Sequence, residues 1–344
     1  MDQHEVVTST LTEVEQHVLI ICRKHTRWAH SGPSREELLR KTVEKFGGSP
    51  DDVTRALDSL VSRAWLELDS NEAHVTLCDR AVPVAWQLDH AESQVEFGKW
   101  LCAFEQSATY AEFCRRVYDT PFAQFNMVDH EQLTELMKRI QLTPEHRVLD
   151  LGCGVGTQSE YLSDTTGAKF LGIDFSAAAV ARAVARTAAK RDRLDFRVSD
   201  LDVFELPGRD FTHVLSFDTL YFVDDLENTL KRAFASLRRG GQFAAFYSEM
   251  QREGESNEIL NPSSTRLAQA LQKLGCAFDW VDFTESERLL WTRYLEAALS
   301  LRAQFEAEGN GKFTEGLEEE ARGVLQKCEE RQTRRCLYLA TVTD

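Results

Sequence analysis

Residues 147–156 read RVLDLGCGVG, a stretch that combines two different sequence patterns. Its first half is an apolar run interrupted by one aspartate, as expected for a strand buried inside a sheet. Its second half places glycine at alternate positions, Gly152, Gly154 and Gly156, just before a helical pattern. Because glycine is costly inside a strand or a helix, these three indicate a strand-to-helix turn with unusual backbone angles or with a ligand close by.

The spacing of the glycines bears on which ligand the turn would serve. A turn that binds the pyrophosphate of a dinucleotide has the pattern G-x-G-x-x-G, which here would require glycine at position 157. Thr157 occupies that position, and the third glycine comes one residue earlier. The dinucleotide interpretation is weakened by this difference, although spacing alone does not exclude it.

The region from 146 to about 284 alternates strand and helix patterns, which is typical of a parallel sheet with crossover helices. Helices are clearest at 177–190 and 226–237, and the second should end in a cap and turn at 238–241. Strands are expected at 147–151, 169–173, 194–198, 212–217, 242–247 and 278–283, with a last strand at 336–342.

The G-x-G-x-G turn after VLDL resembles the first motif of the class I S-adenosylmethionine-dependent methyltransferases. Further stretches agree in order and spacing: FLGID, DFRVSD, THVLSFDTLYFVDD and LRRGGQFAAF. The resemblance covers roughly residues 110–284 and the last strand. It implies an α/β fold with a Rossmann-like seven-stranded methyltransferase sheet, S-adenosyl-L-methionine as cofactor and S-adenosyl-L-homocysteine as product.

The same resemblance implies roles for three acidic residues. Asp174 would hold the two ribose hydroxyls, Asp200 would meet the adenine amino group, and Asp150 would accept a hydrogen bond near the cofactor's amino group. Because this cofactor has no phosphate, the glycines would serve close approach of the backbone to it. The cofactor-binding residues implied in this way are Asp150, Gly152, Cys153, Gly154, Gly156, Thr157, Asp174, Phe175, Ser176, Asp200, Leu201 and Phe217.

Methyl transfer is a single in-line displacement that depends mainly on alignment and desolvation. A general base matters when an oxygen or ammonium nucleophile must lose a proton. The candidates for that base are Tyr110, Tyr118, His130, Tyr221 and Glu249. Tyr221 and Glu249 follow the fourth and fifth strands, at the sheet edge where ligands bind in open α/β folds. For Tyr110 and Tyr118 the competing interpretation is aromatic core filling.

Missing motifs narrow the class of acceptor. The place of the D/N/S-P-P-Y/F/W motif of base-amine methylases reads SFDTLY at 216–221, and no proline precedes a cysteine as in cytosine-C5 enzymes. The magnesium-binding set of catechol-type enzymes and the C-x-x-x-C-x-x-C motif of radical enzymes are also missing from the sequence. We therefore expect metal-free transfer to an N, O or C nucleophile of a small metabolite, in a specialised biosynthetic pathway.

Residues 1–90 are expected to form a winged-helix-like domain with three helices and a hairpin. One helix should follow Ser34 as its N-cap in a capping box, another should begin at 49–52, and strands should lie at 65–68 and 74–77. Ten Lys and Arg face fifteen Asp and Glu in this part. Nucleic-acid binding is therefore not expected, and a homodimer contact or lid packing is favoured.

Two further helical regions should contribute to the acceptor site. Residues 91–142 form an aromatic-rich helical linker or lid, and the methyltransferase domain, 143–344, has a helical insertion at about 286–332. The insertion is expected as one helix, a turn at 306–316 and a second helix at 317–332. Together the two regions would cap an apolar acceptor pocket. Residues expected on one face of the first helix are Trp291, Tyr294, Leu295, Ala298, Leu299 and Phe305.

The composition limits the partners and the location. The chain has 344 residues, a net charge of −16 and eight cysteines without a C-x-x-C pair, so thiol-metal and redox-dithiol sites lose support. The N-terminus shows no signal peptide and no window is apolar enough to span a membrane, which predicts a cytoplasmic protein. The alternatives are an RNA or protein methyltransferase that docks its partner through the N-terminal domain, and a binding protein on a methyltransferase-like fold.

Overall fold

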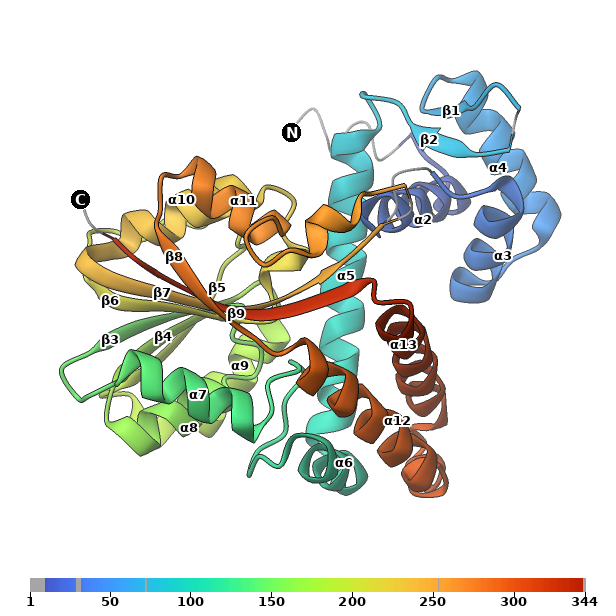
Figure 1. Ribbon diagram of the computed structural model, residues 1–344. Helices are drawn as coiled ribbons and strands as arrows, with labels where there is room; N and C mark the ends of the chain where they lie inside the picture. The colour runs from blue at the N-terminus through green and yellow to red at the C-terminus, as the bar shows by residue number, and fades with distance from the viewer. Residues whose placement is uncertain (1–9, 29–31, 72, 253, 343–344) are drawn as a thin grey trace. The chain divides into compact units, whose positions relative to one another are not determined.

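The computed structural model describes residues 10–28, 32–71, 73–252 and 254–342 (Figure 1). The chain divides into two compact units, Met1–Glu96 with Arg252–Glu255, and Phe97–Gln251 with Ser256–Asp344. The boundary lies inside helix α5, Val82–Glu105, and not after residue 90. Residues 1–9, which carry much of the signal-peptide argument, and residue 72 of the predicted hairpin turn lie outside the described residues.

The first unit contains three helices and a hairpin in the predicted order. Ser34 and Ser49 cap α3 and α4, because their Oγ atoms accept hydrogen bonds from the N–H groups of Glu37 and Asp52, each at 3.1 Å. The winged-helix interpretation of these elements stays a prediction. The elements are α2 Glu13–Trp28, α3 Arg35–Phe46, α4 Pro50–Ser62, β1 Leu66–Leu68 and β2 Val75–Leu77, the two strands pairing antiparallel.

The second unit is built on a seven-stranded sheet in the order β5-β4-β3-β6-β7-β9-β8. The first five of these run parallel, whereas β9 lies antiparallel between β7 and β8. The sheet is therefore mixed: the parallel arrangement expected for residues 146–284 holds for the first five strands, and β8 of that region runs antiparallel to β9. The bounds are β3 Arg147–Leu151, β4 Lys169–Asp174, β5 Leu194–Val198, β6 Phe211–Phe217, β7 Leu237–Met250, β8 Phe278–Asp282 and β9 Thr333–Thr341.

Helices cover both faces of this sheet (Figure 1). Residues of α7, α8 and α9 share one buried apolar cluster with one face, and residues of α10 and α11 share another with the opposite face. The bounds are α7 His130–Ile140, α8 Thr157–Thr166, α9 Ala177–Arg186, α10 Leu226–Ser236 and α11 Arg266–Lys273, with short 3-10 turns η1 Ala188–Lys190, η2 Leu220–Phe222 and η3 Asn257–Leu260.

The predicted turn at 238–241 is part of a strand. Strand β7 begins at Leu237, directly after α10, and Leu237 pairs with Phe211. The register is irregular between Phe211 and His213, and Gly240 has a φ of 71° in this stretch. The two adjacent glycines therefore serve a strand irregularity rather than a helix cap. Similarly, the helix predicted at 177–190 ends at Arg186, and η1 follows.

The C-terminal helices pack with α6, Ala108–Tyr118, in a separate apolar cluster. The helices are α12 Thr284–Ala307 and α13 Gly311–Glu329, so the connection is much shorter than the predicted turn at 306–316. Trp291, Tyr294 and Phe305 are buried as expected, but Leu299 is 44% exposed. No helix in the described ranges is long and apolar enough to cross a membrane.

Candidate active site

The three glycines of the turn between β3 and α8 have different surroundings. Two of them pack closely against neighbouring residues, and the third faces open space. Gly152, Gly154 and Gly156 all have positive φ, at 71°, 54° and 69°. A Cβ on Gly152 would lie 2.2 Å from Thr219 Cγ2, and one on Gly156 would lie 2.4 Å from the Phe196 ring. A Cβ on Gly154 would meet no atom within 4 Å. Open space therefore lies in front of the middle glycine.

Asp174 ends β4 and holds this turn in place. Its Oδ2 accepts a hydrogen bond from the Gly154 N–H at 2.9 Å, and its Oδ1 accepts one from the Ser176 N–H at 2.8 Å. Ser176 also caps α9 by accepting a hydrogen bond from Ala179. The carboxylate is 5% exposed, and burial raises its pKa. Since each carboxylate oxygen can accept a second hydrogen bond, Asp174 can still receive donors from a ligand.

Asp150 and Gln158 adjoin the same turn, and each carries a buried atom without a hydrogen-bond partner. Asp150 Oδ2 accepts from Ser159 Oγ at 2.5 Å, which leaves Oδ1 unpartnered. Gln158 Oε1 accepts from Asn126 at 2.5 Å, which leaves Nε2 unpartnered. Burial raises the pKa of Asp150 to about 7. A buried polar group without a hydrogen bond costs about 1–3 kcal/mol. Asp150 Oδ1 can therefore accept, and Gln158 Nε2 can donate, a hydrogen bond to a ligand.

The predicted residues next to the turn are engaged with the chain itself. Thr157 Oγ1 donates to the Ala123 carbonyl at 2.8 Å. The thiol of Cys153 donates to the Gly154 carbonyl at 3.6 Å, and burial raises the pKa of this thiol well above its usual value. The ring of Phe175, just after β4, lies 5.9 Å from the ring of Phe97.

The three remaining cofactor candidates lie at the ends of β5 and β6. Asp200 follows β5, is half-buried, and accepts a hydrogen bond from the Asp202 N–H at 2.9 Å. Leu201 packs in the cluster between the sheet and α10. Phe217 packs in the core on the opposite face, where its ring stacks on Phe246 with centroids 6.2 Å apart. Phe217 is only 6% exposed, so its side chain serves the core.

Four of the five candidate bases are buried or occupied by neighbours. Tyr110 donates to the Gln124 carbonyl at 2.7 Å, Tyr118 donates to Met127 Sδ at 3.5 Å, and burial raises the pKa of both phenols well above the usual value. Burial and the charge of Asp218 raise the pKa of Tyr221 in the same direction. These raised values oppose proton acceptance by a neutral phenol, which must first ionise.

The other two candidates differ in exposure. Glu249, near the end of β7, is 2% exposed and forms an ion pair with Arg266, whose backbone N–H also donates to it at 2.7 Å. His130 is the first residue of α7 and is exposed. Thr219 lies against Gly152 of the glycine turn, and Tyr221, two residues after Thr219, is the candidate nearest to it in the sequence. The assignment of a base among them stays a prediction.

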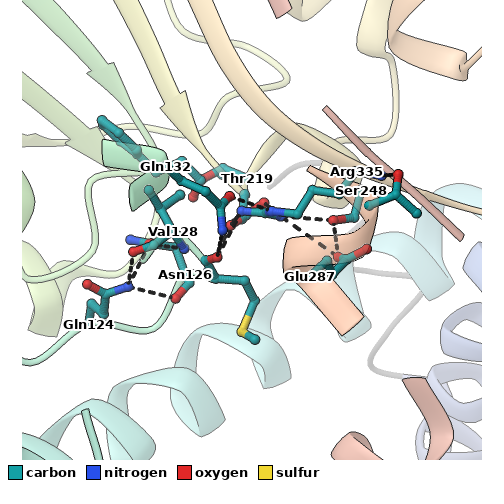
Figure 2. A network of polar contacts seen from close by, with 12 residues as sticks. Gln124, Asn126, Val128, Gln132, Thr219, Ser248, Glu287 and Arg335 are labelled. Carbon is teal, nitrogen blue, oxygen red and sulfur yellow. Dashed lines mark hydrogen bonds and ion pairs between the residues drawn. The ribbon is translucent and has the colours of Figure 1, made fainter. Parts of the chain in front are cut away.

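A buried polar network that the sequence did not predict is centred on Arg335 of β9 (Figure 2). The guanidinium is fully buried and all five of its N–H bonds are used. It binds both carboxylate oxygens of Asp218, at 2.7 and 2.9 Å. The other acceptors are Gln132 Oε1 at 2.8 Å, Ser248 Oγ at 2.9 Å and the Met127 carbonyl at 3.0 Å. Its only sequence signal is alternation, because Arg335 shares a strand face with the buried Thr333 and Leu337.

This network connects the glycine turn to the segment between α6 and α7, residues 119–129. Asp218, in the left-handed region with a φ of 58°, accepts a hydrogen bond from the Met127 N–H at 2.8 Å. Further along the same segment, Asn126 binds Gln158 at the start of α8. Figure 2 shows Gln124, Asn126 and Val128 of this segment joined by hydrogen bonds. The segment is therefore fixed both to the helix after the glycine turn and to β9.

The sheet order, with β9 antiparallel between β7 and β8, and the glycine turn after β3 define a class I methyltransferase fold. Residues 148–241 match the family model described as a methyltransferase domain. The chain therefore carries a methyltransferase domain of the class I, S-adenosylmethionine-dependent type.

Similar proteins cover only parts of this chain. Phosphoethanolamine N-methyltransferase 1 of Zea mays is 30% identical over 112 residues, 33% of this chain and 22% of that protein. Methyltransferase GfsG of Streptomyces halstedii is 32% identical over 119 residues, 33% of this chain and 42% of that protein. The chain thus spans between about a fifth and two fifths of the length of these relatives.

One solved structure shows the shared fold. Phosphoethanolamine N-methyltransferase 2 of Haemonchus contortus, in complex with phosphomonomethylethanolamine and S-adenosylhomocysteine, has a TM-score of 0.58 and 19% sequence identity to this chain. The match covers 72% of this chain and 60% of that one.

Proposed function

We propose that this chain transfers a methyl group from S-adenosyl-L-methionine to an N, O or C nucleophile of a small molecule. The observation that carries the proposal is the open space in front of Gly154, bordered by a buried carboxylate that already holds the loop. The positive φ of Gly154 already favours glycine at this position, but Gly154 differs from Gly152 and Gly156 in that no neighbouring atom fills the space where a side chain would be.

The residues present fit the chemical groups of this cofactor. Asp174 would accept hydrogen bonds from the two ribose hydroxyls, and Asp200 would meet the adenine amino group. The unpartnered Oδ1 of Asp150 would accept from the amino group of the methionine part, and the unpartnered Nε2 of Gln158 would donate to its carboxylate. When bound, the cofactor supplies a methyl carbon activated by a positively charged sulfur.

On the acceptor side, the chain's part is to orient the nucleophile and to exclude water. The apolar cluster that α6, α12 and α13 form with the end of α5 contributes buried aromatic side chains, among them Phe104, Phe113 and Trp291. An apolar surrounding of this kind removes water from a nucleophile and so favours displacement at carbon. The phosphoethanolamine N-methyltransferases named above act on a small molecule, which supports a small acceptor here. We propose a metal-free step, since the magnesium-binding set of catechol-type enzymes is missing from the sequence.

Calorimetric titration of the full chain tests the proposal. S-adenosyl-L-homocysteine should bind in a single-site titration, whereas NADH should not bind, since the pyrophosphate pattern is broken at Thr157. Absence of binding by S-adenosyl-L-homocysteine would refute the proposed cofactor.

Docking of a macromolecule through the N-terminal unit is not favoured. The helix α4, which would face nucleic acid in a winged helix, exposes Asp51 and Asp58. We propose instead that this unit pairs with a second copy of the chain. Light scattering of the full chain should then give twice the mass of one chain, and a single-chain mass would contradict the pairing.

A further inference from the structure

Two amide side chains of the segment 119–129 have their orientation fixed by backbone groups. Gln124 Nε2 donates to the carbonyl oxygens of Asn126 and Val128, at 3.1 and 2.8 Å. The Val128 N–H donates in turn to Asn126 Oδ1 at 3.1 Å (Figure 2). A backbone carbonyl can only accept and a backbone N–H can only donate. Neither side-chain amide can therefore be turned end over end without the loss of these hydrogen bonds.

The orientation of Asn126 determines that of Gln158, the second residue of α8. Asn126 Oδ1 accepts from the Val128 N–H and from Gln124 Nε2. Its Nδ2 is therefore the end that reaches Gln158, and it donates to Gln158 Oε1 at 2.5 Å. The carbonyl end of the Gln158 amide is thus occupied, and its Nε2 is buried without a hydrogen-bond partner. Through this series of contacts, Gln158 can act toward a ligand as a donor and not as an acceptor.

The free donor of Gln158 belongs to a helix start that favours a negative charge. Helix α8 begins at Thr157, directly after the glycine turn, and no side chain caps its N-terminus at Gly156. The first N–H groups of a helix lack a partner within the helix, and together with the helix dipole they attract anions. Gln158 adds a donor on a side chain that is 4% exposed. The combination suits a group that only accepts hydrogen bonds, such as a carboxylate.

The segment 119–129 is held firmly enough to serve as a support for Gln158. Beside the bond from Asn126, a second hydrogen bond attaches the segment to the first turn of α8, since Thr157 Oγ1 donates to the Ala123 carbonyl at 2.8 Å. On its other side, both backbone groups of Met127 are bound by the buried network around β9. Asn126 lies between these attachments, so its position relative to Gln158 is fixed from both directions.

We propose, on the basis of the proposed function, that Asn126 is a positioning residue for the cofactor. It holds Gln158 as a hydrogen-bond donor to the carboxylate of the methionine part, and so makes the site selective for ligands that carry this carboxylate. Asp150, whose unpartnered Oδ1 can accept from the amino group, completes the recognition of an amino acid that bears both charges. Asn126 lies outside the residues 148–241 that match the methyltransferase family model, so this selectivity comes from a part of the chain that precedes them.

Two ligands that differ only in the carboxylate test the selectivity. S-adenosyl-L-homocysteine and its decarboxylated analogue, 5′-(3-aminopropylthio)-5′-deoxyadenosine, are titrated separately into the full chain in a calorimeter. The wild type should bind S-adenosyl-L-homocysteine more tightly by at least about tenfold, the ratio that ~1.4 kcal/mol gives. Equal affinities would overturn the assignment and leave the proposed cofactor in place, whereas binding of neither ligand would overturn both.

The variant Asn126→Asp tests the orientation, because aspartate has the same shape as asparagine but no donor. An aspartate oxygen would face Gln158 Oε1, so the Gln158 amide should turn and present its carbonyl oxygen to the ligand. The preference for S-adenosyl-L-homocysteine should fall to about threefold or less, while the affinity for the decarboxylated analogue and the melting temperature stay as in the wild type. Asn257→Asp, the same change at an exposed asparagine of η3, should keep the wild-type preference. A preference that survives in Asn126→Asp would overturn the proposal.

A further pair of variants separates the orientation of the amide from the added charge. Gln158→Met removes the amide at nearly constant volume and should by itself abolish most of the preference. In that background, Asn126→Asp should change the remaining preference by less than about twofold, because the two positions are coupled only through the amide. Direct repulsion between the aspartate and the ligand carboxylate would instead weaken binding of S-adenosyl-L-homocysteine equally in both backgrounds. That result would overturn the role of Asn126 as a positioning residue.

Discussion

Replacement of Arg335 by methionine should destabilise the second unit strongly. Arg335 is 0% and Asp218 1% exposed, so the substitution leaves an unpaired charge in the interior. Removal of one partner from a buried ion pair costs about 3–5 kcal/mol. At about 2–4 °C per kcal/mol for a domain of 150–250 residues, the melting temperature should fall by roughly 6–20 °C.

Scanning calorimetry and urea unfolding of three variants would measure this loss. Arg322→Met, at an exposed arginine of α13, is the matched control and should change stability by less than about 0.5 kcal/mol. Asp218→Asn alone should also be costly, because Arg335 then loses its counter-charge. In the double variant the two losses should not add, with a coupling free energy of at least about 1 kcal/mol. A loss in Arg335→Met no larger than that of the control, or additive losses, would refute the reasoning.

The cofactor turn gives three further predictions. Asp174→Ala should weaken binding of S-adenosyl-L-homocysteine about tenfold or more in calorimetry, because each hydrogen bond to a charged acceptor contributes about 1.5–3 kcal/mol; unchanged affinity would contradict its role. Gly154→Ala should weaken that binding while the chain still folds, whereas Gly156→Ala should mainly lower the melting temperature, since its Cβ would meet Phe196 at 2.4 Å; the reverse ranking would count against open space at Gly154. Burial raises the pKa of Asp150 from 3.8 to about 7, so between these values the folded chain holds a proton that the unfolded chain has lost. The free energy of unfolding should therefore fall as pH rises through that window, and urea titrations on either side of it should show a larger fall for the wild type than for Asp150→Asn.

Much of the sheet could be predicted from the sequence because its parallel strands are buried on both faces. Such strands appear as short, nearly continuous apolar runs, and the ranges expected for β3 and β5 match the structure residue for residue. The start of β7 was wrong for a physical reason. Adjacent glycines after a helix ordinarily indicate a cap, and only the pairing of Leu237 with Phe211 reveals a strand with an irregular register.

The candidate site shows the same division between local and distant causes. The glycine turn and Asp174 could be predicted because their roles follow from the local backbone, and Asp174 lies where its carboxylate meets the Gly154 N–H. The pairing of Asp218 with Arg335 joins residues 117 positions apart. Alternation along the last strand shows only that Arg335 shares a face with Thr333 and Leu337, and the inward orientation of that face is set by pairing with β7 and β8.

The pairing of Asp218 with Arg335 connects the last strand, β9, to the turn after β6. Asp218 occupies a left-handed backbone conformation, which costs an L-residue about 1–2 kcal/mol. Contacts of its side chain must offset this cost. Arg335 and the Met127 N–H fix it through both carboxylate oxygens. The following residue, Thr219, then lies against Gly152 so closely that only glycine fits there. The geometry of the cofactor turn and that of the buried network thus share one support, because the Arg335 guanidinium binds Asp218 in the turn after β6 and the next residue of that turn, Thr219, lies against Gly152.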